Sequence, residues 1–196
     1  MQEVELTMEK MVFEGKALAR QDRFVVFVDD ALPGEKVIAT IYKKKKQFAN
    51  ARVKEILVPS PDRLTPACPM FGACGGCVFQ HYAYPAQLRM KRDVLIESLH
   101  GLPGIPEIVR EIAGAGDPFY FRNKMGFAFG LRDGIPVLGL HRRGDWRTVV
   151  PTDMCLLESP QSVEIMKRTM AFATSKGIAV YDERKREGIL RHLVVR

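Results

Sequence analysis

Four cysteines are the residues with the clearest chemical potential in this 196-residue chain. Three lie in the segment ACPMFGACGGCVFQH, with the spacing C-x5-C-x2-C, and the fourth lies far along the chain in DMCLLE. Two glycines between the last two cysteines of the loop let the backbone curl and direct amide N–H groups at thiolates. We predict a metal site that closes only when the chain folds back on itself. Its predicted ligands are Cys68, Cys74, Cys77 and Cys155.

The ligand set is all sulfur, because no histidine or carboxylate occupies a ligand position. Four thiolates select soft metals, so zinc and an iron–sulfur cluster are both candidates. Zinc ribbons usually pair two C-x2-C knuckles, and this sequence has one. The radical-SAM pattern C-x3-C-x2-C is missed, because the step from Cys68 to Cys74 is too long. Buried thiols and a disulfide remain the alternatives to a metal.

A run of four lysines followed by an aromatic residue separates two predicted strands. Mutual repulsion makes such a run costly to pack, so we expect it to project into solvent as a loop. One interpretation is a contact surface for a phosphate backbone with an aromatic stacking platform, and the alternative is a solubilising turn. The RNA-binding candidates here are Lys43, Lys44, Lys45, Lys46 and Phe48.

Basic and aromatic side chains also alternate over residues 119–150, where we predict an antiparallel meander with turns at 132–134 and around Gly144. Positive charge for phosphates and flat rings for bases are what a single-stranded RNA site needs. A solvated face over an aromatic core is the alternative. The RNA-binding candidates in this segment are Arg122, Lys124, Arg142 and Arg143.

These residues must be positioned by two modules of a mainly β, α+β fold. Residues 1–58 hold short β-branched runs between turn residues, which predicts a small barrel. Residues 59–66 form a proline-punctuated linker, expected to be extended. Residues 67–196 form the second domain, with further strands expected at 178–181 and 189–195.

Two helices are predicted in the second domain. The first begins at Pro85 and ends near His100, with leucines on one face. The second spans 160–175, with Ser159 as its N-cap and Gly177 just after its end. A methionine-containing apolar stripe on the second helix is more typical of a core than of a cofactor surface.

Charge is unevenly distributed along the chain, whose net charge is +7. The first 30 residues hold seven acids against four bases, whereas residues 31–56 hold seven bases against two acids. This pattern favours a polyanionic partner. The amino terminus lacks the features of a signal peptide, and no run has the length of a membrane span. We therefore expect a cytoplasmic protein with reduced thiols and no membrane partner.

Four passages resemble the amino-terminal part of the bacterial-type RNA (uracil-5-)-methyltransferases. LPGEKVIATIYKKKKQFANARV, with FEGKALARQDRFVVFVDD before it, resembles the TRAM domain, an OB-like RNA-binding barrel. CPMFGACGGCVFQH resembles the family's [4Fe-4S] cysteine loop, and PTDMC the segment that donates the fourth ligand. FRNKMGFAFG with LGLHRRGDW is similar to the central-domain meander, and GILRHLVVR to the strand that leads toward the catalytic domain.

The resemblance implies methylation of uridine C5 in rRNA or tRNA with S-adenosylmethionine as methyl donor, and a [4Fe-4S] cluster. In that reaction a cysteine thiolate adds to C6 of a flipped-out uracil, C5 takes the methyl group, and a base removes the C5 proton. The sequence departs from the family pattern, because the Rossmann-like catalytic domain, the nucleophilic cysteine and the proton-abstracting glutamate are not found in it. No catalytic residue is therefore assigned.

From this departure we expect a monomeric amino-terminal fragment that is inactive alone, with a separately encoded catalytic half as a candidate partner. Its first helix would then lean on the absent domain. The competing hypothesis is a stand-alone RNA-binding module that holds an iron–sulfur cluster or zinc and performs no catalysis.

Overall fold

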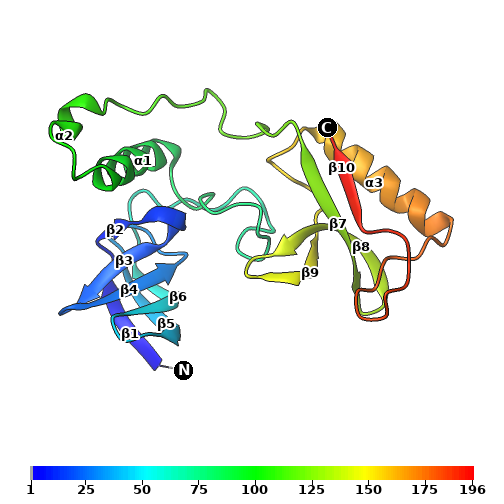
Figure 1. Ribbon diagram of the computed structural model, residues 1–196, viewed down its shortest axis with the longest axis horizontal. Coiled ribbons are helices and arrows are strands. Elements are labelled where there is room, and N and C mark those ends of the chain that lie inside the picture. Colours follow the sequence, from blue (N-terminus) through cyan, green and yellow to red (C-terminus); the bar gives the residue numbers. More distant parts are fainter. Residues whose placement is uncertain (1) are drawn as a thin grey trace. The chain divides into compact units, whose positions relative to one another are not determined.

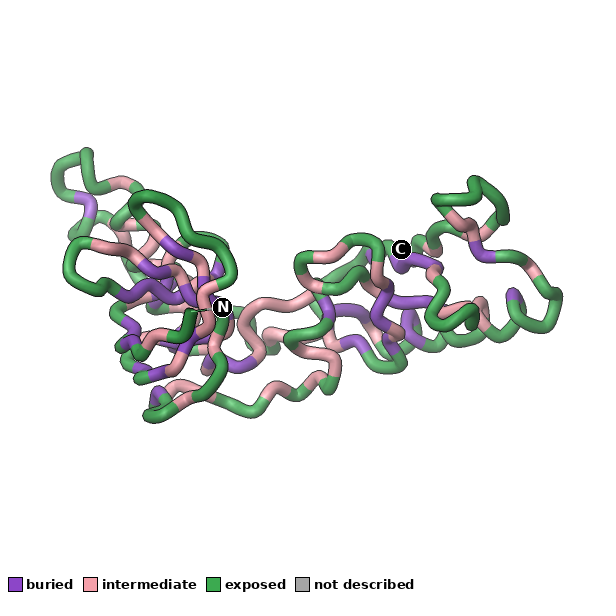
Figure 2. The backbone as a smooth tube through the Cα atoms, turned by 90° about the horizontal axis from the view of Figure 1, so that it is seen from below, coloured by how far each residue is buried: buried purple, intermediate pink, exposed green. Residues whose placement is uncertain are grey.

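The computed structural model describes residues 2–196, which form two compact units (Figure 1). Unit 1 comprises the chain up to Thr65 together with Phe79–Gly114. Unit 2 comprises Pro66–Val78 and Ala115–Arg196. Each unit has its own hydrophobic core, and Figure 2 shows the buried residues in separate groups. Within the described residues, no helix is long and apolar enough to cross a membrane.

Unit 1 is built on a curved sheet in the order β1-β5-β6-β4-β3-β2. β4 and β6 pair in parallel and the other neighbours are antiparallel. Register shifts between β5 and β6 bend the sheet, and β1 approaches β3, as a small barrel requires. The elements are β1 (Gln2–Thr7), β2 (Lys10–Met11), the 3-10 turn η1 (Phe13–Gly15), β3 (Ala17–Gln21), β4 (Phe24–Asp29), β5 (Lys36–Lys44) and β6 (Phe48–Val58).

The core of unit 1 is lined by small and β-branched residues on alternate strand positions. Ala17, Ala19, Ala49 and Ala51 are fully buried, and Val37 is buried with them. Small side chains let the strands of a narrow barrel approach one another across the interior. The predicted barrel at 1–58 therefore rests on alternation that the sequence already displayed.

Helix α1 (Tyr84–Ser98) packs on the barrel core of unit 1. Its buried residues are Ala86 and Met90, whereas Leu95 is 41% exposed. The sequence placed this helix in the second domain, with its leucine face turned toward an absent domain. The observed division differs, because the face that carries Ala86 and Met90 joins the unit 1 core. The short helix α2 (Ile105–Ile108) follows in the same unit.

The proline-rich segment 59–66 is attached to unit 1. Ser60 is buried, and its N–H donates to the carboxylate of Glu35 at 3.2 Å. Arg63 donates to the same carboxylate. The segment expected to be an extended linker is thus bound to unit 1 by polar contacts, which its proline content did not predict.

Unit 2 contains an antiparallel sheet in the order β10-β7-β8-β9, covered by helix α3 (Figure 1). Asp133 and Gly134 both have positive φ, as a two-residue hairpin turn requires, so the predicted turn at 132–134 is confirmed. The elements are β7 (Met125–Arg132), β8 (Ile135–Arg142), β9 (Asp145–Pro151), α3 (Pro160–Ser175) and β10 (His192–Val195).

Three predicted strands are shorter or absent. The strand predicted at 189–195 is observed only as β10, over His192–Val195. The first meander strand begins at Met125 rather than near Tyr120, because the N–H groups of Tyr120 and Arg122 donate to the carbonyls of Leu156 and Leu157. Residues 178–181 form no strand and make one isolated bridge, Val180 to Leu190.

Helix α3 has the predicted boundaries. The Ser159 hydroxyl accepts from the Ser162 N–H at 3.2 Å, and Gly177 follows with φ of 61°. Met166 and Ala173 are buried in the unit 2 core. The prediction of an amphipathic core helix is confirmed, since capping and periodicity are local signals.

Candidate functional site

The cysteine loop of unit 2 is attached to the carboxyl end of β8. The Gly75 N–H donates to the His141 carbonyl at 2.9 Å, and the Arg143 N–H donates to the Ala73 carbonyl at 2.9 Å. A Cβ added at Gly75 would lie 3.1 Å from the His141 oxygen. The glycines therefore let the loop lie directly against the strand.

Thiols from both predicted segments lie in one electrostatic environment. Burial raises the pKa of the Cys74 thiol, and the charges of Cys155 and Cys68 raise it further. The Gly76 N–H, 3.4 Å from the Cys74 sulfur, lowers this pKa, as does Arg122. Cysteines separated by about 80 positions in sequence thus interact in the folded unit.

The remaining predicted ligand, Cys77, packs with Cys155 in the unit 2 core. Gly76 lies close beside it, because a Cβ there would lie 2.9 Å from the Leu140 Cδ1 and 3.5 Å from the Cys74 sulfur. None of the four cysteines forms a disulfide. Within residues 2–196, no group of three or more His, Cys, Asp or Glu residues is arranged to hold a metal ion. The donor chemistry and the glycine cradle fit a soft metal group, although the thiols are not gathered around one point.

The lysine run lies where β5 meets β6 in unit 1. Lys43 and Lys44 end β5, and the Lys45 N–H donates to the Phe48 carbonyl at 2.8 Å. All four lysines are exposed, but only Lys45 and Lys46 lie in the predicted loop, because Lys43 and Lys44 pair with β6 as the last residues of β5. Phe48 is half-buried and packs edge-on against Phe27, with ring centroids 5.8 Å apart. One face of the predicted stacking platform is therefore partly engaged by the barrel.

Tyr42, which directly precedes the lysine run, is a ring that the sequence reading missed. Its hydroxyl donates to Asp29 at 2.7 Å, and the Lys16 ammonium lies 3.6 Å from the same carboxylate. Lys16 also donates to Asn50 at 3.0 Å. Burial and the Asp29 carboxylate raise the pKa of Tyr42, so it stays protonated. This network holds a half-exposed aromatic ring beside the four lysines. The only sequence feature that could have pointed to Tyr42 is its position directly before the lysine run.

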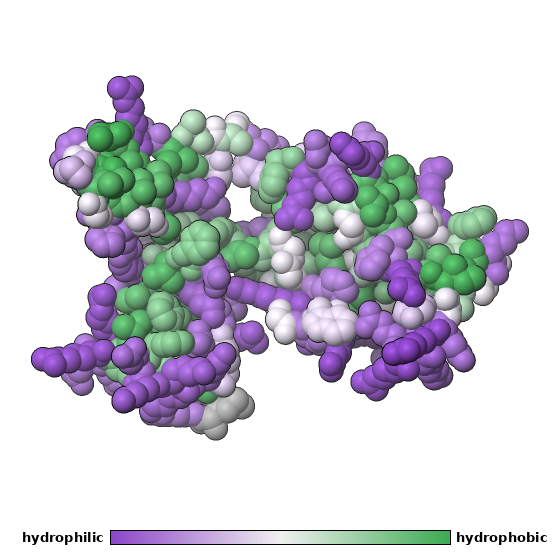
Figure 3. Space-filling model, in the orientation of Figure 1, coloured by the Kyte–Doolittle hydropathy of each residue, from purple (hydrophilic) through white to green (hydrophobic). Residues whose placement is uncertain are grey.

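The four basic candidates of the meander are brought together in unit 2. They line a cavity of about 630 Å³ that also contacts the glycines of the cysteine loop and Trp146. The hydrophilic side chains that surround this sheet are visible in Figure 3. The predicted residues that share the cavity are Arg122, Lys124, Arg142 and Arg143.

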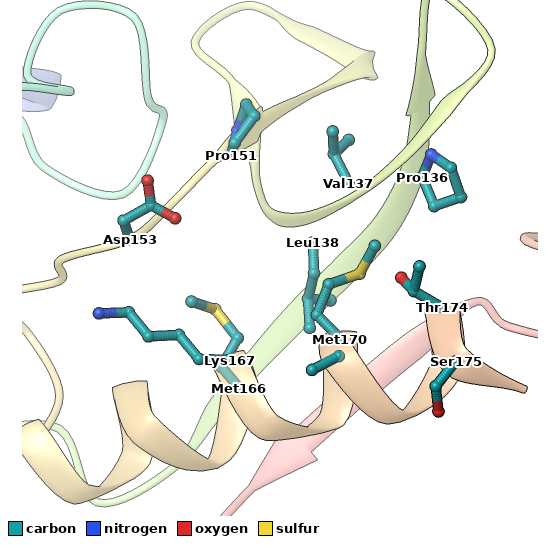
Figure 4. Close-up of a pocket in the computed structure, with 11 residues that line it drawn as sticks. Pro136, Val137, Leu138, Pro151, Asp153, Met166, Lys167, Met170, Thr174 and Ser175 are labelled. Carbon is teal, nitrogen blue, oxygen red and sulfur yellow. The ribbon is translucent and has the colours of Figure 1, made fainter.

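A separate apolar groove of about 640 Å³ lies between α3 and β8 (Figure 4). Met166 and Met170 of α3 face Leu138 of β8 across it. Its charged neighbours are Lys167 and Asp153. The methionines belong to the packing of the core, as the sequence predicted.

Comparison with known proteins gives a family match for the first module. Residues 1–54 match the TRAM domain. The chain is 34% identical over 98% of its length to an uncharacterized RNA methyltransferase of Halalkalibacterium halodurans, of which it covers 42%. It is 33% identical over its full length to an uncharacterized RNA methyltransferase of Enterococcus faecalis, of which it covers 43%. The chain thus spans less than half the length of these relatives.

Among solved structures, the chain is similar to the Pyrococcus abyssi tRNA (uracil-54, C5)-methyltransferase in complex with S-adenosyl-L-homocysteine. The TM-score is 0.69 at 25% identity, over 97% of this chain and 42% of that chain.

These matches correct the predicted fold class. The α+β description agrees with the sheets and helices of the structure. The fold-class prediction also stated that a catalytic Rossmann-like domain is absent. That part of the prediction is wrong, because the match does not support it. The likeness extends over 97% of this chain but only 42% of a methyltransferase, so it gives no support for saying that the protein lacks the remainder.

Proposed function

We propose that this chain supplies the RNA-recognition and cluster-binding part of an S-adenosylmethionine-dependent methyltransferase that acts on uridine C5 in rRNA or tRNA. The observation that carries the proposal is the likeness over 97% of the chain to a tRNA (uracil-54, C5)-methyltransferase. RNA methyltransferases are also the relatives that match nearly the whole chain.

RNA recognition is assigned to two surfaces, one in each unit. In unit 1, Lys43–Lys46 neutralise phosphates, and the ring of Tyr42 lies beside them. In unit 2, the basic cavity beside the cysteine loop offers bidentate arginine donors to phosphate oxygens. Both surfaces are exposed, so they bind and orient RNA rather than carry out bond-breaking steps.

A [4Fe-4S] cluster is assigned to the four cysteines. The mutual influence of Cys68, Cys74 and Cys155 supports it, as does the glycine cradle beside Cys77. Each thiolate of such a cluster binds a different iron, so its ligands lie farther apart than those around a single zinc ion. When bound, the cluster neutralises the thiolates and ties the loop to the Cys155 segment.

Deletion of the gene in its host, followed by mass-spectrometric mapping of 5-methyluridine in rRNA and tRNA, tests the function. We expect at least one uridine to lose its methyl group and re-expression to restore it. Unchanged 5-methyluridine at every mapped position would overturn the proposal and favour a binding module without catalysis. Iron, sulfide and zinc analysis after anaerobic purification tests the cluster separately, and one zinc without sulfide would refute it.

A further inference from the structure

A second polar cavity of about 640 Å³ lies on the sheet of unit 2. Its floor is formed by β7, β8 and β9, and its wall by the segment 181–192. It shares His141 and Trp146 with the cavity beside the cysteine loop, and the rest of its lining is different. Its volume is in the range of pockets that hold small organic groups.

Two arginine–aromatic pairs stand at this cavity. The Arg191 guanidinium carbon lies 3.6 Å from the centroid of the Tyr181 ring, and that of Arg147 lies 5.4 Å from the centroid of Trp146. A guanidinium stacked on a ring keeps a fixed orientation and directs its N–H groups along the ring plane. Trp146 is nevertheless 59% exposed, so much of its surface remains open to a ligand.

The wall that carries Tyr181 is held by a tight turn. The Asp182 carboxylate accepts from the N–H groups of Arg184 at 2.8 Å and Lys185 at 3.2 Å. These N–H groups lower the pKa of Asp182, so its charge is engaged in the turn. Gly188 has φ of 102°, and a Cβ there would lie 2.3 Å from the Val180 oxygen. Tyr181 and Arg191 are therefore placed before any ligand arrives.

The lining combines flat rings with a small excess of positive charge. Three arginines, Arg147, Arg184 and Arg191, face two acidic residues, and one of these, Asp182, is occupied by the turn. Every nucleobase has a face that stacks on an aromatic ring, and arginine pairs with phosphate oxygens. The lining combines apolar and aromatic side chains with an equal number of charged and polar ones, as a nucleotide with a flat base and a charged phosphate requires.

We propose that this cavity binds one unpaired nucleotide of an RNA strand, with the base stacked on Trp146 and the phosphate held by Arg191. The proposal rests on the proposed function in taking RNA as the ligand. It adds a binding subsite that includes Tyr181 and Arg191, which lie outside the basic cavity beside the cysteine loop.

Trp146 is the single tryptophan of the chain, so its fluorescence reports on the cavity directly. A single-stranded oligoribonucleotide is expected to quench this fluorescence, whereas a blunt RNA duplex of the same length is not. Arg191→Lys keeps the charge but loses the planar stack, and we expect it to weaken the quenching titration about tenfold. The matched control is Arg168→Gln on α3, an exposed arginine paired with Glu164, which should titrate like the wild type. Circular dichroism checks that each variant is folded.

Equal quenching by duplex and single strand, or equal titrations for Arg191→Lys and Arg168→Gln, would overturn the subsite. Equal quenching by a free mononucleotide at the same concentration would assign the cavity to a small nucleotide and refute an RNA site. Salt-dependent RNA binding without any quenching would refute the subsite while leaving the proposed function intact. Failure of the proposed function is read separately, from 5-methyluridine mapping.

Discussion

Removal of Arg63 should destabilise unit 1, because it leaves a buried carboxylate without its partner. Glu35 is fully buried in the connection between β4 and β5 and accepts from the Leu32 N–H at 2.9 Å and the Ser60 N–H at 3.2 Å. Arg63 donates to both carboxylate oxygens, at 2.8 Å for Nη2 to Oε2, and to the Asp30 carbonyl at 2.8 Å. Arg63→Met keeps much of the side-chain volume and removes all these donors.

The magnitude follows from how far the pair is removed from water. Breaking a buried ion pair costs about 3–5 kcal/mol. The Arg63 side chain is 20% exposed while that of Glu35 is fully covered, so we expect the lower end of this range, about 3 kcal/mol. For a unit of this size, that free energy lowers the melting temperature by about 15 °C. The matched control is Arg89→Met, which removes an exposed ion pair with Asp62 and should cost under about 1 kcal/mol.

The deficit should also depend on pH. Burial alone raises the pKa of Glu35, but the hydrogen bonds from Arg63, Leu32 and Ser60 outweigh it and hold this pKa below the ordinary 4.5. In the wild type this contribution is present above pH 4.5 and is lost as the pH falls through the lowered value. In Arg63→Met burial dominates, so Glu35 takes up a proton on acidification and the penalty disappears.

Urea unfolding at several pH values, followed by circular dichroism, measures the effect. Trp146 fluorescence follows unit 2, which should unfold as in the wild type. The reasoning is refuted if Arg63→Met costs no more than Arg89→Met at pH 7, or if its deficit stays constant below pH 4.5.

Three further predictions address the cluster, the sheet and the lysine run. Cys74→Ser should lower the iron content after anaerobic purification and the melting temperature of unit 2; unchanged iron would remove Cys74 from the ligand set. Gly139→Ala should destabilise unit 2 by at least about 2 kcal/mol, because the added Cβ would lie 1.9 Å from the Val150 oxygen; Gly126→Ala, with nothing within 4 Å, is the control in urea unfolding. Replacing Lys43–Lys46 by glutamine should weaken RNA binding. The slope of the logarithm of the binding constant against the logarithm of the salt concentration should become shallower by about 0.7 for each phosphate of a single strand that is no longer neutralised. An unchanged slope would identify the lysine run as a solvated turn.

Local signals in the sequence predicted the elements whose causes are local. The ends of α3 follow from the Ser159 cap and from Gly177, and both are observed. The turn at Asp133 and Gly134 likewise needs residues that adopt positive φ. Barrel strands were recognisable because buried and exposed positions alternate along them, as Val37 and Ala39 illustrate.

Long-range packing could not be read in the same way. The leucines of the helix at 84–98 suggested its buried face, yet the residues that reach the core are Ala86 and Met90. The face that packs on the barrel carries these two residues, which join Tyr82 in the unit 1 core. The start of β7 at Met125 depended on carbonyls of the 156–157 segment, about 30 positions away.

Some candidate site residues could be predicted from local sequence patterns, and others could not. Arg122 and Lys124 directly precede β7, and Arg142 and Arg143 lie at the end of β8, so the predicted antiparallel hairpin brings these candidates to one end of the sheet. Tyr181 and Arg191 were missed because a turn stabilised by Asp182 and Gly188 brings them together over the sheet. Neither the turn geometry nor its position over β9 is encoded in a periodic pattern.

The attachment of the cysteine loop to β8 links the proposed cluster site to the proposed RNA-binding cavity. The backbone hydrogen bonds at Gly75 and Arg143 fix the loop to the strand end that carries Arg142. Arg122 lines the adjacent cavity and also acts on the Cys74 thiol. In the proposed function, a group that neutralises the thiolates would order the same backbone that presents these arginines to phosphate. The proposed cluster would then influence RNA affinity through the loop without contacting RNA, since the loop and the basic cavity share the hydrogen bonds at Gly75 and Arg143.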